Sequence, residues 1–422
     1  MVTVAVEMKD ISLLGALRRP GVRGSFLGLF LGQAASTSAL TTSVSLGSIL
    51  ATQIAGTASV SGLPATINMV AASLSAFAAG MAMGRYGRRA GMLTGYLVGA
   101  VGAAIGCLFA LSHNLPGFLV GSAMVGMAQA VVLQGRYAAA DLVPAAARGR
   151  AVGVLLFGSV IGAALAALLT RPLQGVSALV GRPALELGWG QSAILLLLGA
   201  IAIGALFRQP GRAVMAAGER LRFRDYLAVA GRPAIRLGVV NLVVGQAVMV
   251  MLMNLFPIHA LHYGQTLPTI STIISAHVAG MFALAWLSGG LVDKFGSTTI
   301  SLAGGALLMV GALVSSESTG AVGLGVGLFL IGLGWNFCFV SGSALLAKNL
   351  DADIRARFQG TTDVLVWLCA GSATLGGGLI VGVYQYPAVG LLGGVAAAAL
   401  LLLTGGTWVH LRGAARSEAA ST

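Results

Sequence analysis

The chain has 422 residues, of which 57% are hydrophobic and only 9% are charged, and its mean hydropathy is +0.91. A soluble globular domain with this composition would expose a very large apolar surface, so the composition excludes that class and indicates a membrane protein. The formal net charge of +13 raises the question of nucleic-acid binding. The positions of the basic residues along the chain answer it.

Long apolar runs recur along the sequence. A bilayer core of about 30 Å needs roughly 20 apolar residues per helix. The runs are continuously apolar rather than alternating, which favours helices over a β-barrel. We therefore expect an all-α membrane protein with about twelve spans by this criterion, in chain order 24–50, 60–83, 90–112, 116–141, 150–170, 190–208, 233–260, 266–290, 297–315, 320–347, 357–382 and 386–410.

The basic residues favour one side of the membrane. If the N-terminus is cytoplasmic, only Arg171 and Arg182 fall in an outer loop, and nearly all the other arginines and lysines face the cytoplasm. The positive-inside rule then places both termini in the cytoplasm. The net charge is thus a signal of topology, and we expect a multi-pass monomer in the lipid bilayer of the inner membrane with no nucleic-acid partner.

The two halves of the sequence repeat. Gly32-Gln33-Ala34 matches Gly245-Gln246-Ala247, 213 positions later, and Arg148-Gly149-Arg150 matches Arg355-Ala356-Arg357, 207 positions later. A loop segment, 80–87, matches 289–296 with an offset of 209. Three matches in order predict a parallel repeat of six spans plus six. Such repeats build transporters in which two bundles rock about a central site.

This repeat predicts the domain organisation. We expect a cytoplasmic N-terminal segment, an N-terminal six-helix bundle, a cytoplasmic linker, a C-terminal six-helix bundle and a cytoplasmic tail. The linker is the one long polar segment and lies at the centre of the repeat. The predicted boundaries are 1–23, 24–208, 209–232, 233–410 and 411–422.

The loop segments carry a recognisable motif. Gly289-x-Leu291-x-Asp293-Lys294-x-Gly296 resembles the cytoplasmic loop motif of the major facilitator superfamily, and Gly80-x-x-x-Gly84-Arg85-x-Gly87-Arg88-Arg89 resembles its first-half copy. The first copy has Gly84 where the family has an acid, which in the family is thought to hold a latch with an Arg. The resemblance implies the fold of that superfamily.

The fifth span resembles the antiporter motif of the family's proton-linked exporters in degenerate form. It carries Gly153, Gly158 and Gly162, with Ala163 where those exporters have proline. The motifs are therefore nearest to the drug or metabolite:proton antiporter branch. This resemblance implies export coupled to protons.

Few charged residues fall inside the predicted spans, where a charge costs roughly 2.5–3.5 kcal/mol. Asp363 lies roughly 10–13 Å above the cytoplasmic end of its span, and either proton coupling or a structural ion pair with Arg357 explains it. Arg136 and Asp141 lie in the fourth span, where either a role in proton coupling or a gating role at the helix end explains them. His277 lies mid-span, where it either binds substrate or titrates, or makes one helix–helix hydrogen bond.

Uncharged polar and aromatic residues mark a candidate substrate surface. Gln33 and Gln246 occupy matched depths in spans that usually line the central cavity in the resembling family, and their amides both donate and accept hydrogen bonds. Bridging between helices is the alternative role. Aromatic and amide groups suit an amphiphilic organic substrate, and the remaining candidates are Thr37, Asn254, Trp335, Asn336 and Trp367.

Other chemistries lack their motifs. The sequence has no phosphate-binding loop, no Ser/His/Asp nucleophile pattern and no zinc-ligand set, so we expect neither an enzyme nor a cofactor. His259 and His262 have no Cys or acid nearby that would complete a metal site. Cys107, Cys338 and Cys369 fall inside predicted spans and are expected to pack rather than form disulfides.

These patterns together predict a secondary transporter of a small organic molecule. Proton-coupled export is the first expectation, with protons and the substrate as partners. Proton-symport uptake of a metabolite or metal chelate is an alternative. A non-transporting sensor or assembly factor on the same fold is a third possibility that the sequence leaves open.

Overall fold

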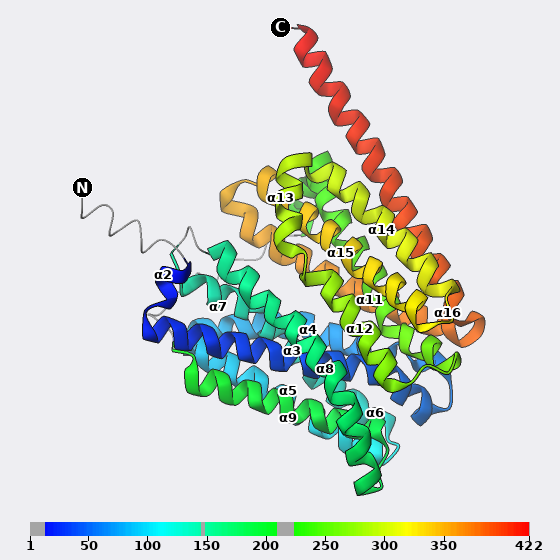
Figure 1. Ribbon diagram of the computed structural model, residues 1–422. Helices are drawn as coiled ribbons and strands as arrows, with labels where there is room; N and C mark the ends of the chain where they lie inside the picture. The colour runs from blue at the N-terminus through cyan, green and yellow to red at the C-terminus, as the bar shows by residue number, and fades with distance from the viewer. Residues whose placement is uncertain (1–12, 145–147, 209–222, 422) are drawn as a thin grey trace. The chain divides into compact units, whose positions relative to one another are not determined.

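The computed structural model describes residues 13–144, 148–208 and 223–421, and every regular element in these ranges is a helix (Figure 1). The chain divides into two compact units. Unit 1 comprises Met1–Ala217 with Thr266–Ser275, and unit 2 comprises Gly218–Gln265 with Ala276–Thr422. The two units are described separately below.

Unit 1 is a bundle of long helices. Three of them begin with a proline in the first turn, where the missing N–H has no intrahelical role. The side chain of Asn114 caps one of these helices by accepting from the Gly117 amide at 2.8 Å. The elements are α2 (Leu13–Leu17), α3 (Pro20–Ala55), η1 (Ala58–Val60), α4 (Leu63–Tyr86), α5 (Arg88–Leu111), α6 (Leu115–Leu133), α7 (Gly135–Asp141), α8 (Arg148–Val180) and α9 (Ala184–Leu206).

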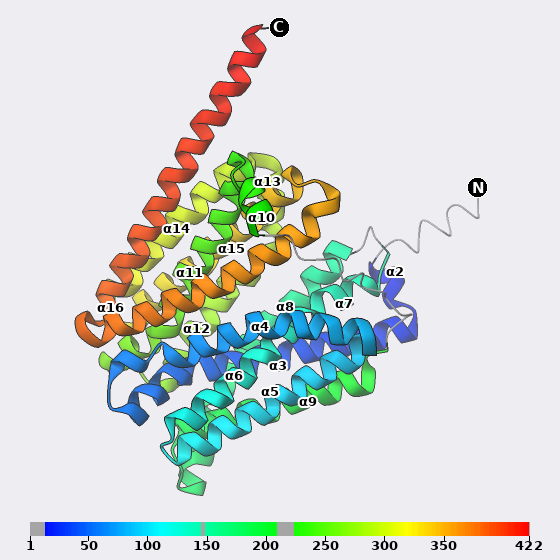
Figure 2. The same cartoon turned by 180° about the vertical axis from the view of Figure 1, so that it is seen from behind.

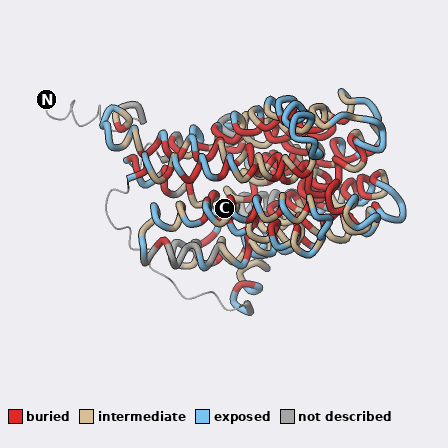
Figure 3. The backbone as a smooth tube through the Cα atoms, turned by 90° about the horizontal axis from the view of Figure 1, so that it is seen from below, coloured by how far each residue is buried: buried red, intermediate tan, exposed pale blue. Residues whose placement is uncertain are grey.

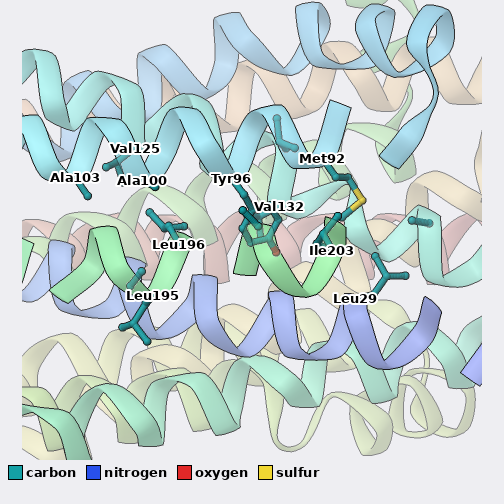
Figure 4. Packing of buried hydrophobic residues seen from close by; sticks show 14 of the residues in the cluster. Leu29, Met92, Tyr96, Ala100, Ala103, Val125, Val132, Leu195, Leu196 and Ile203 are labelled. Carbon is teal, nitrogen blue, oxygen red and sulfur yellow. The ribbon is translucent and has the colours of Figure 1, made fainter. Parts of the chain in front are cut away.

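The core of unit 1 forms where α5 packs on α6 and α9, and α3 packs on α9 and α8. Tyr96 of α5 lies at its centre, with Leu29, Met92, Val132 and Ile203 from four helices around it (Figure 4). All five side chains are buried. The buried residues run along the helices of each unit, as the red segments of Figure 3 show.

Unit 2 contains a short helix and a second set of long helices (Figure 2). Here α14 packs on α15 and α16, and α11 packs on α15 and α16. The first part of α12 belongs to unit 1. The elements are α10 (Phe223–Ala230), α11 (Pro233–His262), α12 (Leu267–Phe282), α13 (Ala285–Phe295), α14 (Ser297–Glu317), α15 (Ala321–Asn349) and α16 (Ala352–Ser421).

Eight helices of the described chain are long and apolar enough to cross a membrane, or nine if α12 and α13 form one bent span. Each predicted span coincides, to within several residues at its ends, with one of the helices, with a consecutive pair or with part of α16. The two last predicted spans, 357–382 and 386–410, both lie in α16, which is interrupted at Gln385 with φ 64° and ψ −179°. The expected count of twelve spans stays a prediction.

Four predicted spans differ from the helices in their boundaries or continuity. The span 116–141 is interrupted at Gln134, between α6 and α7, and the span 266–290 is interrupted between Phe282 and Ala285. The span 150–170 continues to Val180, and the span 190–208 begins earlier, at Ala184. Hydropathy marks the apolar part of a helix, whereas a helix continues as long as its backbone hydrogen bonds do.

Candidate functional site

The two copies of the loop motif share a backbone feature. Gly87 joins α4 to α5 with φ 89° and ψ 154°, and Gly296 joins α13 to α14 with φ 83° and ψ 149°. This region of φ/ψ space is essentially restricted to glycine. The motif therefore needs glycine at both matched positions because the chain turns there between two helices. Gly80 and Arg85 also lie on α4, and the surroundings of these two residues fall outside the described part.

The first copy of the motif contributes to an ion pair. Arg88, the first residue of α5, lies 2.6 Å from the carboxylate of Asp141, the last residue of α7. The Arg88 side chain is 13% exposed and that of Asp141 is 42% exposed. Gly84 lacks the acid of the family pattern, and Asp141 supplies a carboxylate to this motif from another helix. The next residue, Arg89, donates to the Gly204 carbonyl of α9.

The second copy of the motif lies at the surface of unit 2. Asp293 and Lys294 are exposed at the end of α13, and no ion pair joins Asp293 to another described residue. Lys294 lies 5.2 Å from the centre of the Phe295 ring. A side chain at Gly289 would meet no atom within 4 Å. The two copies therefore differ in their contacts, although their turns match.

Gln33 of α3 is bonded within unit 1. Its amide nitrogen donates to the Ser159 hydroxyl of α8 at 2.9 Å and to the Thr37 hydroxyl at 3.4 Å. Gln33 is 8% exposed and Thr37 is partly buried. The structure thus brings Gln33 and Thr37 together and joins α3 to α8 through them.

Gln246 of α11 is bonded differently within unit 2. Its side-chain oxygen accepts a hydrogen bond from the indole N–H of Trp335 at 2.7 Å, which joins α11 to α15. Trp335 also contacts two phenylalanines, Phe282 of α12 and Phe339 of α15. The structure therefore brings two predicted site residues together and adds two aromatic residues that the sequence analysis did not single out.

Two of the buried asparagines of unit 2 are predicted site residues. Asn336 donates to the Met281 carbonyl at 2.6 Å and accepts from the Ser288 hydroxyl, so it contacts the chain on both sides of the interruption between α12 and α13. Asn254 of α11 is 2% exposed, and its amide nitrogen has no hydrogen-bond partner in the described chain. A buried donor of this kind is costly, so it marks a position where a water or ligand would be stabilised.

Asp363 is exposed on α16, inside the segment Thr361–Thr407 that is apolar enough to cross a membrane. Trp367, one turn further along the helix, is partly buried. The neighbouring Thr362 is buried and lies 3.1 Å from the Tyr226 hydroxyl of α10. The expected pairing with Arg357 involves a side chain outside the described part.

Tyr226 anchors the end of the predicted linker. Its ring stacks on Phe358 with centroids 4.4 Å apart, and the residue is 1% exposed. Burial raises the pKa of the Tyr226 phenol, and the hydrogen bond with Thr362 lowers it by less. The linker helix α10 is therefore fixed to the turn of α16 that precedes Asp363.

Two further predicted residues lie in separate places. His277 of α12 is fully buried, and its Nδ1 lies 2.7 Å from the Leu328 carbonyl of α15. A carbonyl only accepts, so Nδ1 carries the proton, and Nε2 has no hydrogen-bond partner among the described residues. A helix–helix bond of this kind is one of the two predicted roles of His277, and the substrate-binding or titrating role stays a prediction. Arg136 lies partly buried on α7.

Glu186 is a buried acid that the sequence analysis missed. It lies in the first turn of α9, is 5% exposed, and has one carboxylate oxygen without a hydrogen-bond partner in the described chain. The positive end of the helix dipole favours a carboxylate at this position. In the sequence, Pro183 is followed three residues later by the acid Glu186, a pattern typical of a helix start. This pattern would have indicated a helix that begins at Ala184 rather than at 190.

Residues 26–374 match the family model of the Major Facilitator Superfamily. The chain belongs to the Major Facilitator Superfamily. Members of this superfamily are transporters, so the protein is a multi-pass membrane transporter of a small molecule and not an enzyme. The match covers the loop motifs and the clusters described above.

Curated relatives and solved structures agree with this assignment to the superfamily. The chain is 29% identical over 379 residues to the MFS-type transporter YdeG of Bacillus subtilis (strain 168), which covers 87% of the chain and 88% of YdeG. It is 23% identical over 349 residues to the riboflavin transporter RfnT of Brucella anthropi, which covers 80% of the chain and 84% of RfnT.

Two solved structures show the same superfamily fold. The nucleoside transporter NupG aligns with a TM-score of 0.66 and 14% identity, over 91% of the chain and 98% of NupG. The E. coli fucose:proton symporter FucP aligns with a TM-score of 0.55 and 17% identity, over 91% and 99%. At these identities the likeness concerns the fold alone.

Proposed function

We propose that the protein is a secondary active transporter that exports a small organic molecule from the cytoplasm in exchange for protons, by rocker-switch alternating access in the inner membrane. The loop motif at 289–296 and the degenerate antiporter motif in α8 support exchange. The sequence repeat supports two bundles that rock about a central site.

The observation that carries the proton coupling is Asp363. It is the one charged residue between 361 and 407, a segment that is apolar enough to cross a membrane. A charge at such a position is costly, and the charged residues that are found there usually form pairs or serve a function. Asp363 also follows Thr362, which holds Tyr226, so a change in its protonation would act directly beside the anchored linker helix.

The test is transport by proteoliposomes that contain a pH-sensitive dye. Riboflavin is the first compound to try, because RfnT is named a riboflavin transporter, followed by a panel of small organic acids and amines. We expect Asp363→Asn to abolish flux driven by a pH gradient, because an amide does not carry a proton, while the protein remains folded.

Asp351→Asn is the matched control. Asp351 is 71% exposed and lies 3.9 Å from Arg232, so it is a surface carboxylate near the same helix. This variant should retain flux. Gradient-driven flux that survives unchanged in Asp363→Asn would show that Asp363 has a structural role.

Proton-symport uptake of a metabolite or metal chelate is the second candidate, because a carboxylate such as Asp363 that carries a proton would serve symport as well as antiport. The sign of the substrate-dependent pH change separates the two candidates, because antiport and symport move protons in opposite directions relative to the substrate.

A further inference from the structure

Three aromatic rings of unit 2 form a corner. Trp335 and Phe339, one turn apart on α15, lie with centroids 5.0 Å apart and planes inclined by 22°. Phe282, the last residue of α12, lies 5.8 Å from Trp335 with its plane inclined by 76°. The Trp335 and Phe339 rings are therefore stacked on one another, so the floor is an outer face of this stack, and Phe282 forms a wall beside Trp335. Phe282 and Phe339 are only partly buried.

The wall of this corner is held in place from α15. Asn336, next to Trp335, donates to the Met281 carbonyl and accepts from Ser288. Phe282 lies between these two anchored residues, where the axes of α12 and α13 differ by 44°. Interrupted helices in a membrane are tolerated where their backbone is satisfied, and in transporters they often border the substrate site.

Gln246 defines the polar edge of the corner. An indole N–H only donates, so the Gln246 atom bonded to Trp335 at 2.7 Å is the amide oxygen. The two N–H groups of Nε2 then remain, and they have no hydrogen-bond partner among the described residues. Gln246 as a whole is 8% exposed, and its Nε2 is not one of the fully buried atoms that lack a partner, so the unused donors lie at the accessible part of the residue.

The matched residue of unit 1 lacks this capacity. The amide nitrogen of Gln33 donates to Ser159 and to Thr37, so its N–H groups are used within the protein. The two glutamines have the same exposed fraction, 8%. Burial therefore does not explain the difference, which lies in what surrounds each amide.

Aromatic residues at helical spacing usually serve packing. Packing alone would bring the rings together without the Gln246 contact, and most buried polar groups in proteins are hydrogen-bonded. A fixed amide with an unused donor, beside the partly buried rings of Phe282 and Phe339, is instead what a ligand site offers: apolar area together with a few oriented polar groups.

We propose that Phe282, Trp335, Phe339 and Gln246 bind a planar aromatic molecule that carries a hydrogen-bond acceptor at its edge. The ring of the ligand stacks on the floor and meets the wall at its edge. Its acceptor, a carboxylate or carbonyl oxygen or a ring nitrogen, receives the N–H groups of Gln246. This inference rests on the proposed transport function and names the class of its substrate.

The experiment measures binding of 2-naphthoate to the purified full-length protein in lipid nanodiscs, by calorimetry and by thermal stabilisation. Decahydro-2-naphthoate keeps the carboxylate and removes the aromatic plane, and we expect it to bind at least about tenfold more weakly because it loses the stacking interaction. Equal binding of the two acids would overturn the proposal, and so would the absence of 2-naphthoate binding up to its solubility limit.

The amide is tested by Gln246→Glu. The carboxylate still accepts from Trp335 but presents an acceptor where the amide donates, so binding of 2-naphthoate should weaken about 10-fold to 100-fold. Binding of 2-naphthylmethylammonium should strengthen, because this ligand donates. The control variant Gln265→Glu, at a glutamine of unit 2 that lies outside the corner and donates to the Thr319 carbonyl, should leave both affinities unchanged. Equal weakening in the two variants, or no change in Gln246→Glu, would overturn the assignment.

Phe339→Leu provides a second variant if Gln246→Glu does not fold. It removes one ring from the floor, and we expect it to weaken 2-naphthoate about tenfold while leaving the saturated acid unchanged. Equal effects on both ligands would contradict the stacking. Binding is measured without a pH gradient, so failure of proton-driven flux and failure of this site are separate results.

Discussion

Arg88 and Asp141 form an ion pair beside the first copy of the loop motif. The pair is 2.6 Å apart and joins the turn at Gly87 to the end of α7. Because the carboxylate is 42% exposed, the pair should contribute at most about 1 kcal/mol to stability. Its role is therefore better sought in the conformational cycle than in the free energy of unfolding.

Asp141→Asn should change the rate of transport while keeping its dependence on the pH gradient. The variant loses the ion pair, so the link between the loop and α7 weakens, but no proton carrier is removed. Flux in proteoliposomes and the melting temperature are the measurements, with Asp351→Asn as the control. Loss of the gradient dependence would identify Asp141 as a coupling residue instead of a gate.

For single residues, the sequence predicts which side chains are candidates for the site better than it predicts the residues with which they form hydrogen bonds. Gln33, Gln246 and Trp335 were recognised as candidates because polar and aromatic groups are conspicuous in apolar spans. That Trp335 reaches Gln246, 89 positions away, depends on how α11 and α15 approach each other. Glu186 was missed because its burial depends on where α9 begins.

Glycines determine how closely α5 and α6 approach. A Cβ atom at Gly121 would lie 2.6 Å from the Gly106 nitrogen and 2.7 Å from the Gly102 carbonyl oxygen. These are backbone atoms, which cannot rotate away as a side chain would. Helix association in a membrane depends on such packing, since lipid removes the hydrophobic driving force between helices.

Gly121→Ala should lower the free energy of unfolding by about 1–3 kcal/mol through overpacking. Thermal or SDS unfolding of the purified protein provides the measurement. Gly175→Ala on α8 is the control, because a Cβ there meets no atom within 4 Å, and its effect should be no more than the gain in helix propensity of about 1 kcal/mol. Equal stabilities for the two variants would contradict the packing argument.

Hydropathy located the helices but not their interruptions. The break between α12 and α13 is compatible with the membrane because Asn336 bonds residues 55 and 48 positions away, Met281 and Ser288. A local pattern of apolar residues contains no information about such a distant partner. The same limitation explains why the span 116–141 was predicted as one helix rather than as α6 and α7.

At the scale of the whole molecule, the distribution of basic residues predicts the topology. Alkaline phosphatase fused after residue 422 should be inactive in a host with a periplasm, and a fluorescent protein at the same position should fold and fluoresce. Phosphatase inserted after Arg182, between α8 and α9, should be active. An active C-terminal phosphatase fusion would refute the cytoplasmic placement of the tail.

The hydrogen bond between Trp335 and Gln246 also gives the protein an optical reporter of its own. Indole emission depends on the polarity around the ring and on the bonding of its N–H. If the other four of the five tryptophans were replaced by phenylalanine, the emission of Trp335 would follow the occupancy of the aromatic corner in real time. The protein then needs no attached dye for stopped-flow measurements of the step that precedes transport.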